Sequence, residues 1–492
     1  MGAMELVADL HLHSKYSRAV SPRMNILEMA SWAEKKGINL LGTGDWTHPL
    51  WLKELKELLE ENDGILRLKA KKKNNSRSEG VQESQFLLSA EISSIYHEKG
   101  KLRRIHNLVF APSFAAVDKI IRELKKRGAN LDSDGRPIIG LSAKNLGELV
   151  FTADKECLLI PAHIWTPWFS LYGSKSGFDS IEDCLGPFAE NIFAVETGIS
   201  SDPAMNWRIS ELDNRSILSF SDAHSPEKMG REATVFEVGD ITRLRYGDIK
   251  EAIVGKREVR DEKLENKAGS EISRNQNSTF QNPTSHFQPH ISCTIEFYPE
   301  EGKYHYTGHR SCRIRQSPEE TKRSGETCPV CGKPLTVGVM HRVEQLASRS
   351  AEEVKGGKFE AIGKMKRIQW GERPSYVRLV PLMEILSESL GSSVGSQKVV
   401  SEFDKLTVKF GSEFKVLLET PLEEIAEVAG GKVAEGVGKV RQGKIVIEPG
   451  YDGVFGTVKI WSSSVKTPEE ENGFFENEVS ENGGQMSIFE KS

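Results

Sequence analysis

Two histidines separated by one residue, His11 and His13, follow a short apolar segment that runs from Leu6 to Leu10. Alternate residues of a β-strand point to the same face, so both imidazoles would leave the end of such a strand side by side. Neutral imidazoles held this close are a natural ligand pair for a borderline metal such as zinc. The pair predicts a metal site at the C-terminal end of the first strand.

Side chains of the same chemical types follow most of the later apolar segments. In chain order they are Asp45 and His48, Glu91, His163, Glu196, and Asp222 with His224, while His106 opens the apolar segment at 108–110. Any one of them alone could be a hydrogen-bonded loop residue, a helix cap or a surface charge, and this alternative stays open for Asp45, His48 and Glu196. Metal-ligand types at so many successive strand ends are hard to obtain by chance, so the set predicts a metal centre built from several strands.

The segments that must position these side chains alternate between strand-like and helix-like patterns from residue 5 to 255. Short apolar runs at 39–42, 86–88, 108–110, 157–161, 192–195 and 217–220 predict strands. Helical patterns lie between them, at 26–36, 49–61, 115–127, 143–153 and 204–212. Such alternation is typical of a parallel α/β sheet, and the length suits an irregular (β/α) barrel with its chemistry at the C-terminal ends of the strands.

The composition is ordinary for a soluble protein of several domains, with 492 residues of which 38% are hydrophobic and 28% charged. No apolar run reaches the ~18 residues that a membrane-spanning helix needs, and the N-terminus lacks a signal-peptide pattern. We therefore expect a cytoplasmic protein without a membrane partner. The net charge of −5 neither requires nor excludes a nucleic-acid partner.

A second group of metal-ligand types lies further along the chain. Its members are His309, Cys312, Cys328 and Cys331. The C-x-x-C turn is a zinc knuckle in which both thiolates reach one ion, and the earlier pair completes the set at comparable spacing. We predict a closed structural zinc site in a module at residues 291–345, with Cys293 as the competitor for the fourth ligand if His309 points away.

The remaining segments differ in composition. Residues 256–290 are polar and rich in Asn, Ser and Gln, which predicts a disordered linker. Residues 346–461 are predicted to be mostly helical, and a glycine turn at Gly430 between two helices resembles a helix-hairpin-helix, a module that binds DNA phosphates. Helix pairs broken by glycine are common, so a purely structural pair is the alternative. Residues 462–492 form an acidic tail.

An aromatic segment with a glycine- and serine-rich turn directly follows His163. Its candidate residues are Trp165, Trp168, Phe169, Tyr172, Gly173, Ser174 and Lys175. Such a segment suits a pocket that stacks a flipped base and offers backbone donors to its edge. Packing of the aromatic rings within the loop is the open alternative.

The strand-end series resembles the PHP (polymerase and histidinol phosphatase) family, an irregular α/β barrel with a multinuclear metal site. The resemblance implies that Glu91 bridges two ions, one held with the first histidine pair and Asp222, the other with His106 and His163. The residues that it implies as catalytic are Asp222, Glu91, His11 and His13. The implied ions are zinc, with magnesium or manganese as alternatives, and two such ions activate a water for phosphoester hydrolysis without a covalent enzyme intermediate.

The resemblance leaves open whether the site holds a third ion. Some PHP proteins hold one through an extra histidine shortly after the first motif, but residues 15–19 contain no histidine. A third ion would therefore depend on the remaining candidates, which are Asp45, His48, Glu196 and His224. The sequence supports at least two ions.

The order of PHP unit, zinc module and helical hairpin, together with the segments 41–49 and 161–167, resembles the endonuclease Q family over residues 5–461. The resemblance implies a DNA repair endonuclease associated with the nucleoid. It would nick double- or single-stranded DNA on the 5′ side of uracil, hypoxanthine, xanthine and abasic sites after base flipping. A small-molecule phosphatase of the histidinol phosphatase type and a non-catalytic repair scaffold are the alternatives.

The tail ends in a short motif made of Gln485, Met486, Ser487, Ile488 and Phe489. It resembles the pentapeptide by which bacterial proteins bind the sliding clamp, whereas the archaeal motif matches less well because its paired aromatics are missing. A glutamine followed by aliphatic and aromatic anchors can dock in a groove at low ordering cost. The motif predicts a sliding clamp as a partner, with chance recurrence as the alternative.

Overall fold

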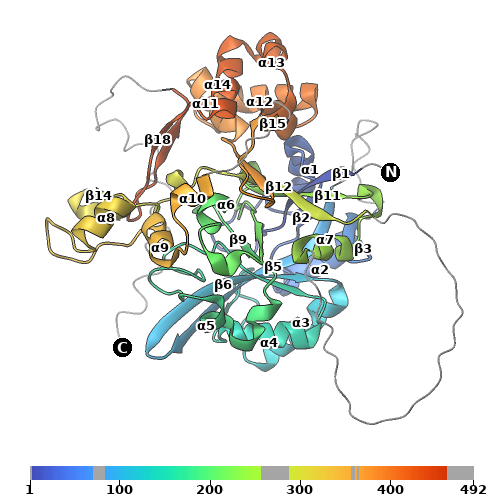
Figure 1. Cartoon of the computed structure of the whole chain (residues 1–492). Coiled ribbons are helices and arrows are strands. Elements are labelled where there is room, and N and C mark those ends of the chain that lie inside the picture. Colours follow the sequence, from blue (N-terminus) through green and yellow to red (C-terminus); the bar gives the residue numbers. More distant parts are fainter. Residues whose placement is uncertain (1–2, 70–83, 256–286, 356–360, 363–364, 462–492) are drawn as a thin grey trace, which may run out of the picture.

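The computed structural model describes residues 3–69, 84–255, 287–355, 361–362 and 365–461. They form a mixed α/β unit around one large sheet, with a helical C-terminal region at the top of Figure 1. No helix within these ranges is long and apolar enough to cross a membrane. The predicted linker lies outside the described residues as far as position 286, and the tail with its clamp motif lies wholly outside them.

The central sheet has eleven strands, and eight of them follow one continuous order. In that order they are β17 (Ser375–Arg378), β12 (His290–Glu296), β11 (Ala233–Val238), β1 (Met4–Asp9), β2 (Leu40–Gly42), β5 (Gln85–Glu98), β4 (Ile65–Leu68) and β3 (Leu59–Asn62). Two further strands, β6 (Lys101–Ala111) and β7 (Ile138–Ile139), pair with β5, and β8 (Leu158–Pro161) pairs with β6.

The prediction of a wholly parallel sheet is wrong. Strands β1, β2 and β5 are parallel to one another, but β5 continues for 14 residues and returns as the antiparallel β6. The return is made at Lys99 and Gly100, whose φ angles of 48° and 75° allow a tight turn. This hairpin places two segments of the predicted metal centre directly beside each other.

The predicted closed barrel is not confirmed. Among the described strands the sheet stays open, and β9 (Ala194–Glu196) and β10 (Ser216–Leu218) pair only with each other. Single contacts link them to the sheet instead, such as the amide of Ile164 donating to the Glu196 carbonyl at 3.1 Å. These strands have three residues each, too few to sustain longer ladders with their neighbours.

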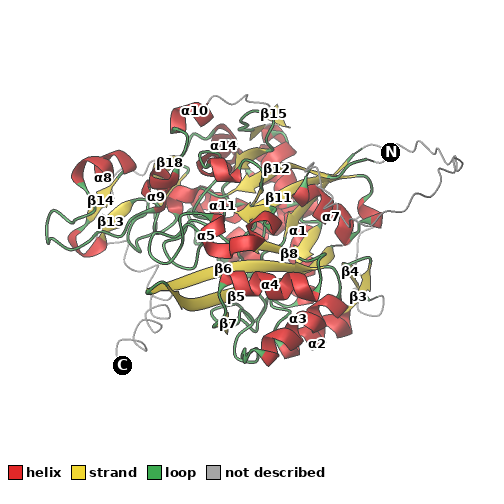
Figure 2. Cartoon of the chain, turned by 60° about the horizontal axis from the view of Figure 1, so that its bottom comes forward, coloured by secondary structure: helices red, strands yellow, loops and turns green. Residues whose placement is uncertain are grey.

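Helices cover the outer faces of the sheet. They are α1 (Ile26–Lys36), α2 (Pro49–Leu58), α3 (Phe114–Lys126), α4 (Ala143–Ala153), α5 (Ile181–Leu185), α6 (Pro203–Asn206) and α7 (Tyr246–Val254). The bounds predicted for α1 and α4 are confirmed; at α1 the Asn25 side chain caps the first turn and Gly37, with a φ of 88°, ends the helix. Figure 2 shows α3 and α4 side by side along β6.

Both faces of β1 are buried. Leu6, Ala8 and Leu10 pack into a core inside the curved sheet, whereas Val7 packs against the core beneath the covering helices. His11 and His13 follow the last residue of β1, Asp9, just beyond this core.

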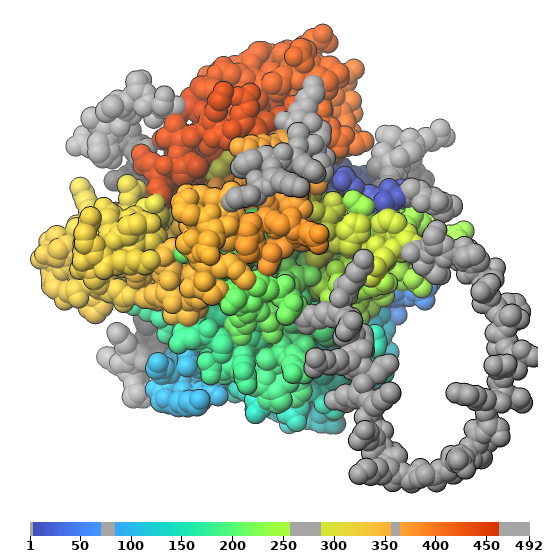
Figure 3. Space-filling view, viewed as in Figure 1, coloured from blue at the N-terminus to red at the C-terminus, as the bar shows by residue number. Residues whose placement is uncertain are grey.

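The second half of the chain contributes to the central sheet as well. Strands β12 and β17 belong to it, although they come from the regions predicted as zinc module and helical domain. The predicted zinc module otherwise contains β13 (Thr307–His309), β14 (Ile314–Gln316), α8 (Pro318–Ser324) and α9 (Val339–Leu346). It is followed by α10 (Ala351–Lys355), β15 (Ala361–Ile362) and β16 (Met365–Lys366). In Figure 3 its yellow surface projects to the left of the molecule.

The predicted helical C-terminal region is confirmed. It comprises α11 (Leu382–Leu390), α12 (Gln397–Phe410), α13 (Leu422–Ala429), α14 (Gly431–Gln442) and the hairpin of β18 (Val446–Glu448) and β19 (Thr457–Lys459). Gly430, with a φ of 88°, joins α13 directly to α14. A buried ion pair of 2.7 Å between Lys36 and Glu413 ties this region to α1.

Candidate metal centre

The first ligand group joins the ends of β1 and β10 to the middle of β5. His11 Nε2 lies 3.8 Å from Glu91 Oε1 and 3.6 Å from Asp222 Oδ1. His13 Nε2 lies 3.5 Å from Glu91 Oε2 and 3.0 Å from Asp222 Oδ1. Four side chains that span more than two hundred residues of sequence thus converge on one point, as predicted.

These atoms fit a metal ion. The Nε2 atoms of His11 and His13 and Oδ1 of Asp222 are buried and make no hydrogen bond with the described residues. Buried polar atoms without partners are costly, so a cluster of them that faces one point calls for a cation. His11, His13 and Glu91 offer ligand atoms within 4.8 Å of one another.

A second group shares Glu91 with the first. His106 Nδ1 lies 2.5 Å from Glu91 Oε1, and His163 Nε2 lies 3.0 Å from the same oxygen. The hairpin explains the contact, because His106 pairs with Ser93, two residues beyond Glu91 on the same face of β5. Glu91 therefore lies within a strand rather than at its end, and its position between both groups suits a bridging ligand.

A third group consists of His13, Asp222 and His224, whose ligand atoms also lie within 4.8 Å of one another. The rings of His13 and His224 are 4.8 Å apart between centroids. The structure therefore places His224 next to His13 and Asp222, two residues of the first group.

Two of the remaining candidates lie behind the ligands. Glu196 Oε1 accepts a hydrogen bond of 2.8 Å from His11 Nδ1, and its second oxygen accepts one of 2.8 Å from the amide of His163. Asp45 Oδ1 lies 3.1 Å from His13 Nδ1. Carboxylates in this position fix the tautomer that leaves Nε2 for a metal.

The last candidate, His48, belongs to none of the three groups. It precedes Pro49 at the start of α2, and its ring stacks on Tyr16 with 4.6 Å between centroids. The structure therefore gives His48 a packing contact rather than a position among the ligands.

Sharp turns of the backbone aim several of these side chains. Asp45, His163 and Asp222 have φ angles of 48°, 30° and 48°, values that non-glycine residues rarely adopt. Beside His163 stands Gly198, where an added Cβ would lie 2.3 Å from the histidine Cβ. Glycine is therefore required for the close approach of these two loops.

Arg136 contacts the site, but no pattern in the sequence marks it as a site residue. It lies in the loop before β7, and its Nη1 atom donates to Glu91 Oε2 at 3.3 Å. About a quarter of its side chain, 26%, stays exposed to solvent while Nη1 contacts Glu91. Such a fork of donors suits a phosphate oxygen.

The carboxylates of the site are in the form that cations bind, but His11 and His13 must first release protons. Burial acts to lower the pKa of both imidazoles, and the surrounding carboxylates raise it, for His13 to about 9. Burial alone would raise the pKa of Glu91, but the charges of His106 and Arg136 hold it well below its usual value. Burial likewise acts to raise the pKa of Asp222, and the neighbouring histidines, His11 foremost, hold it well below. Burial lowers the pKa of His106 to about 4. Ionised carboxylates beside a neutral imidazole are the forms that divalent ions bind.

Comparison with solved structures decides the family. The crystal structure of the lesion-specific endonuclease PfuEndoQ from Pyrococcus furiosus is 30% identical to this chain, with a TM-score of 0.72 over 95% of this chain and 98% of that one. The chain belongs to the endonuclease Q family. An endonuclease Q structure in complex with a 27-mer duplex, with an abasic lesion at its active site, matches with the same identity and TM-score over 95% and 100%.

Two curated relatives are also similar. The uncharacterized protein YqxK from Bacillus subtilis is 29% identical over 467 residues, which cover 92% of this chain and 99% of that protein. The uncharacterized protein MJ0043 from Methanocaldococcus jannaschii is 31% identical over 311 residues, and the match spans 62% of this chain but only 32% of that protein. The family model of the MJ0043 C-terminal domain matches residues 381–444, which contain α11 to α14.

In this member of the endonuclease Q family, the fold brings the four predicted zinc ligands close together. His309, Cys312, Cys328 and Cys331 offer ligand atoms within 4.8 Å of one another. Although desolvation acts to raise it, backbone amides around the knuckle lower the pKa of Cys328 to about 6, which favours the thiolate. Cys293 is buried on β12 and is not part of the group. The identity of the ion stays a prediction.

The structure divides the predicted base-pocket loop into two parts. Trp165 and Tyr172 are fully buried and pack on each other, with hydrogen bonds of 2.8 Å to Asn206 and 2.7 Å to Glu211. They have the packing role that the sequence left as the alternative. Gly173 is buried too and leaves no room for a side chain.

The other loop residues reach the surface. Trp168 and Phe169 are half-buried and Lys175 is exposed, while the Ser174 hydroxyl donates to the Val337 carbonyl at 3.1 Å. The Phe169 ring lies against His106, with 4.7 Å between centroids. A base that entered the site would therefore meet Trp168 and Phe169 rather than the inner aromatics.

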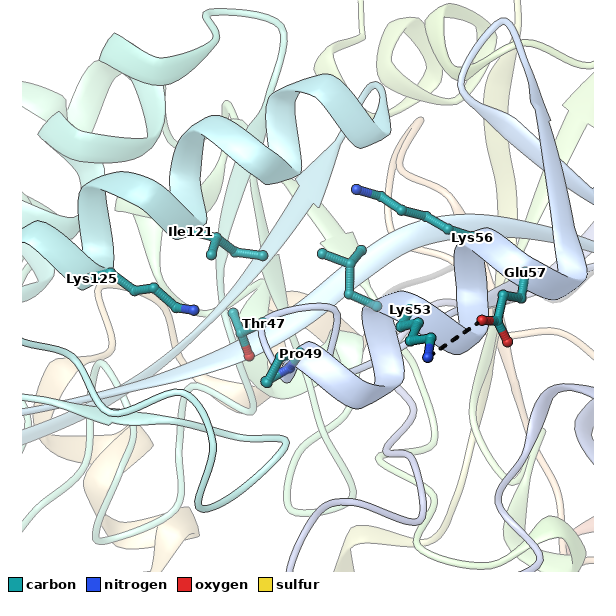
Figure 4. A pocket seen from close by; sticks show the side chains of 8 residues that line it. Thr47, Pro49, Lys53, Lys56, Glu57, Ile121 and Lys125 are labelled. Atoms are coloured by element: carbon teal, nitrogen blue, oxygen red, sulfur yellow. Dashed lines mark ion pairs between the residues drawn. The ribbon is translucent and has the colours of Figure 1, made fainter.

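A groove of about 390 Å³ between α2 and α3 is separate from the ligand groups (Figure 4). Its walls carry Lys53, Lys56 and Lys125, but Lys53 pairs with Glu57 and Lys56 pairs with Asp118. The carboxylates offset much of the positive charge, so the groove offers no comparable site.

Proposed function

We propose that this member of the endonuclease Q family is a DNA repair endonuclease that hydrolyses the phosphodiester on the 5′ side of a damaged nucleotide. The damaged nucleotides are deaminated bases (uracil, hypoxanthine, xanthine) and abasic sites, in double- or single-stranded DNA of the nucleoid. The damaged base is flipped out of the helix, which costs less for a mismatched base than for a paired one.

One observation carries the proposal. Buried ligand atoms without partners converge around Glu91, in a chain of which 95% matches an endonuclease Q bound to duplex DNA with an abasic lesion. Membership of the family makes the chain a nuclease. The metal ligands and the lesion at the neighbour's active site support a hydrolytic reaction on damaged DNA.

The ligand groups would hold at least two divalent ions, zinc or alternatively magnesium or manganese, with Glu91 between two of them. Ions in such a site supply a water of lowered pKa and neutralise the charge of the phosphodiester. Glu196 and Asp45 keep His11 and His13 in the tautomers that present Nε2 inward. Arg136 binds a non-bridging phosphate oxygen at the opening of the site.

Replacing Arg136 by alanine should lower kcat/KM for nicking on the order of a hundredfold, because a preorganised donor to the phosphate is lost. Arg136→Lys should recover part of the loss, since it keeps the charge but not the fork. Single-turnover nicking of a uracil duplex measures the effect. Arg122→Ala, which removes an exposed arginine from α3, is the matched control. Unchanged nicking by Arg136→Ala would exclude the phosphate contact.

The direct test of the function is incubation with labelled duplexes that carry one uracil, hypoxanthine or abasic site, with and without a chelator. We expect a nick on the 5′ side of each lesion, lost with the chelator and restored by added zinc, magnesium or manganese. A small-molecule phosphatase would instead hydrolyse a small phosphate monoester and leave the duplexes intact. A repair scaffold would bind the duplexes with or without the chelator and cut none.

The intact chain is required for this comparison. Deletion of residues 291–461 would remove β12 and β17 from the central sheet and expose its core, so loss of activity in such a variant would not identify the substrate.

The sliding clamp stays a predicted partner. The motif from Gln485 to Phe489 lies outside the described residues, and its sequence alone supports docking, which would raise the local concentration of the enzyme at replicating DNA. Removal of the motif should reduce capture on immobilised clamp without changing nicking. Equal capture would exclude this role.

A further inference from the structure

The turn between β18 and β19 presents two large apolar side chains to solvent. Val454 and Phe455 are 40% and 53% exposed. Single exposed apolar residues are ordinary on protein surfaces. Here the rigidity of the turn and the residues around it point to a contact with a partner.

Backbone hydrogen bonds fix this turn on the segment 299–303, which precedes the zinc ligands. The amides of Gly450, Gly453 and Gly456 donate to carbonyls of that segment at 2.9, 2.8 and 2.9 Å. A Cβ added at Gly456 would lie 2.1 Å from the nearest of these carbonyl oxygens, so only glycine lets the turn lie this close. The backbone of the turn is therefore already ordered with Phe455 pointing outward, so binding a partner costs little backbone entropy.

Phe455 ends a row of residues that begins at the candidate metal centre. Its ring centroid lies 5.6 Å from Lys303 Nζ, which is also 5.8 Å from the ring of Tyr304. Tyr304 meets Trp168 edge to face at 5.4 Å, and Trp168 lies five residues after His163. Figure 1 shows the β18 hairpin beside the predicted zinc module.

Positive charge accompanies the exposed ring. Lys303 lies beside the ring, and the Arg310 guanidinium approaches Gly453, two residues before Phe455, with Nη1 3.2 Å from the position of an added Cβ. The Asp452 carboxylate of the same turn accepts hydrogen bonds from the Arg310 amide and the Thr336 hydroxyl. An exposed aromatic ring with a lysine beside it and an arginine on the same turn matches a nucleic acid, which offers base faces for stacking and phosphates for pairing. An apolar protein surface would match the ring but not the cations.

We propose that Phe455 is a wedge that inserts into the duplex beside the flipped nucleotide, with Lys303 and Arg310 on the adjacent phosphates. The inference rests on the proposed function. The ring replaces the stacking that the remaining bases lose when the damaged nucleotide leaves the helix. Single-stranded DNA has no such gap to fill, so the wedge acts only on duplex substrates.

The test compares wild type, Phe455→Ala and Phe455→Trp on duplex and single-stranded DNA with one uracil. Phe455→Ala should lower duplex nicking about tenfold, the loss of roughly one stacked base, and leave single-strand nicking unchanged. Phe455→Trp should keep duplex nicking near wild type. A 2-aminopurine beside the lesion should brighten with wild type and less with Phe455→Ala. Val446→Ala, which trims another exposed apolar residue of the same hairpin, should have no effect.

The outcomes separate the wedge from the proposed function. Wild-type nicking of both substrates, with equal duplex activity in Phe455→Ala, would overturn the wedge alone. An equal loss on duplex and single-stranded DNA would overturn it as well, because that pattern indicates a general defect. A wild-type protein that nicks neither substrate would overturn the proposed function itself.

Discussion

Replacing Asp222 by asparagine should abolish nicking of a uracil duplex, with a loss on the order of a thousandfold, while lesion DNA remains bound. Asp222 Oδ1 lies 3.0 Å from His13 Nε2 and belongs to the ligand group with His13 and His224, so the amide removes negative charge that a cation requires. Asparagine tolerates the φ of 48° at this position, so the backbone should keep its turn.

Single-turnover nicking, metal content and gel-shift affinity measure this effect together. Asp118→Asn is the matched control, because Asp118 is an aspartate of the α3 surface that pairs only with Lys56 in the described structure. It should retain both metal and activity. Retained nicking by Asp222→Asn, with the metal still bound, would contradict the assignment of the metal centre.

Replacing Cys328 by serine should remove about one zinc ion per chain. It should also lower the nicking rate about a hundredfold, because the loop that follows His163 would shift from its position. The segment that follows the predicted zinc knuckle pairs with β13, where Gly308 and Thr336 exchange hydrogen bonds of 3.0 and 2.9 Å. The next residue, Val337, accepts the hydrogen bond of Ser174, so a zinc ion in the quartet would brace the loop from one side.

A second brace comes from α9 of the same module. Arg342 donates at 2.9 Å to the Tyr172 carbonyl and at 3.1 Å to the Phe178 carbonyl. Metal analysis and nicking rates test the prediction, and Cys293→Ala is the control, which should lose no zinc. If Cys293→Ala lost zinc and Cys328→Ser kept it, the quartet would be wrong.

The local parts of both metal sites follow from the sequence. His11 and His13 share a face because the strand period is two, and Cys328 and Cys331 face one point because a short turn joins them. The bounds of α1 follow from a capping Asn25 and a terminal glycine in the same way. Each of these features depends on residues a few positions apart, where backbone geometry alone limits the distances.

The tertiary structure alone decided how distant segments meet. The sequence does not show that β5 continues past Glu91 and returns as β6, and this return brings His106 to the shared carboxylate. Nothing in the residues around Arg136 marks it, because its partner Glu91 lies 45 positions away. Strand pairing and side-chain direction depend on hydrogen bonds and packing between remote segments. The sequence likewise predicts Glu196 and Asp45 as site residues but not their roles. Their contacts with the Nδ1 atoms of His11 and His13 show that they lie behind the histidines rather than among the ligands.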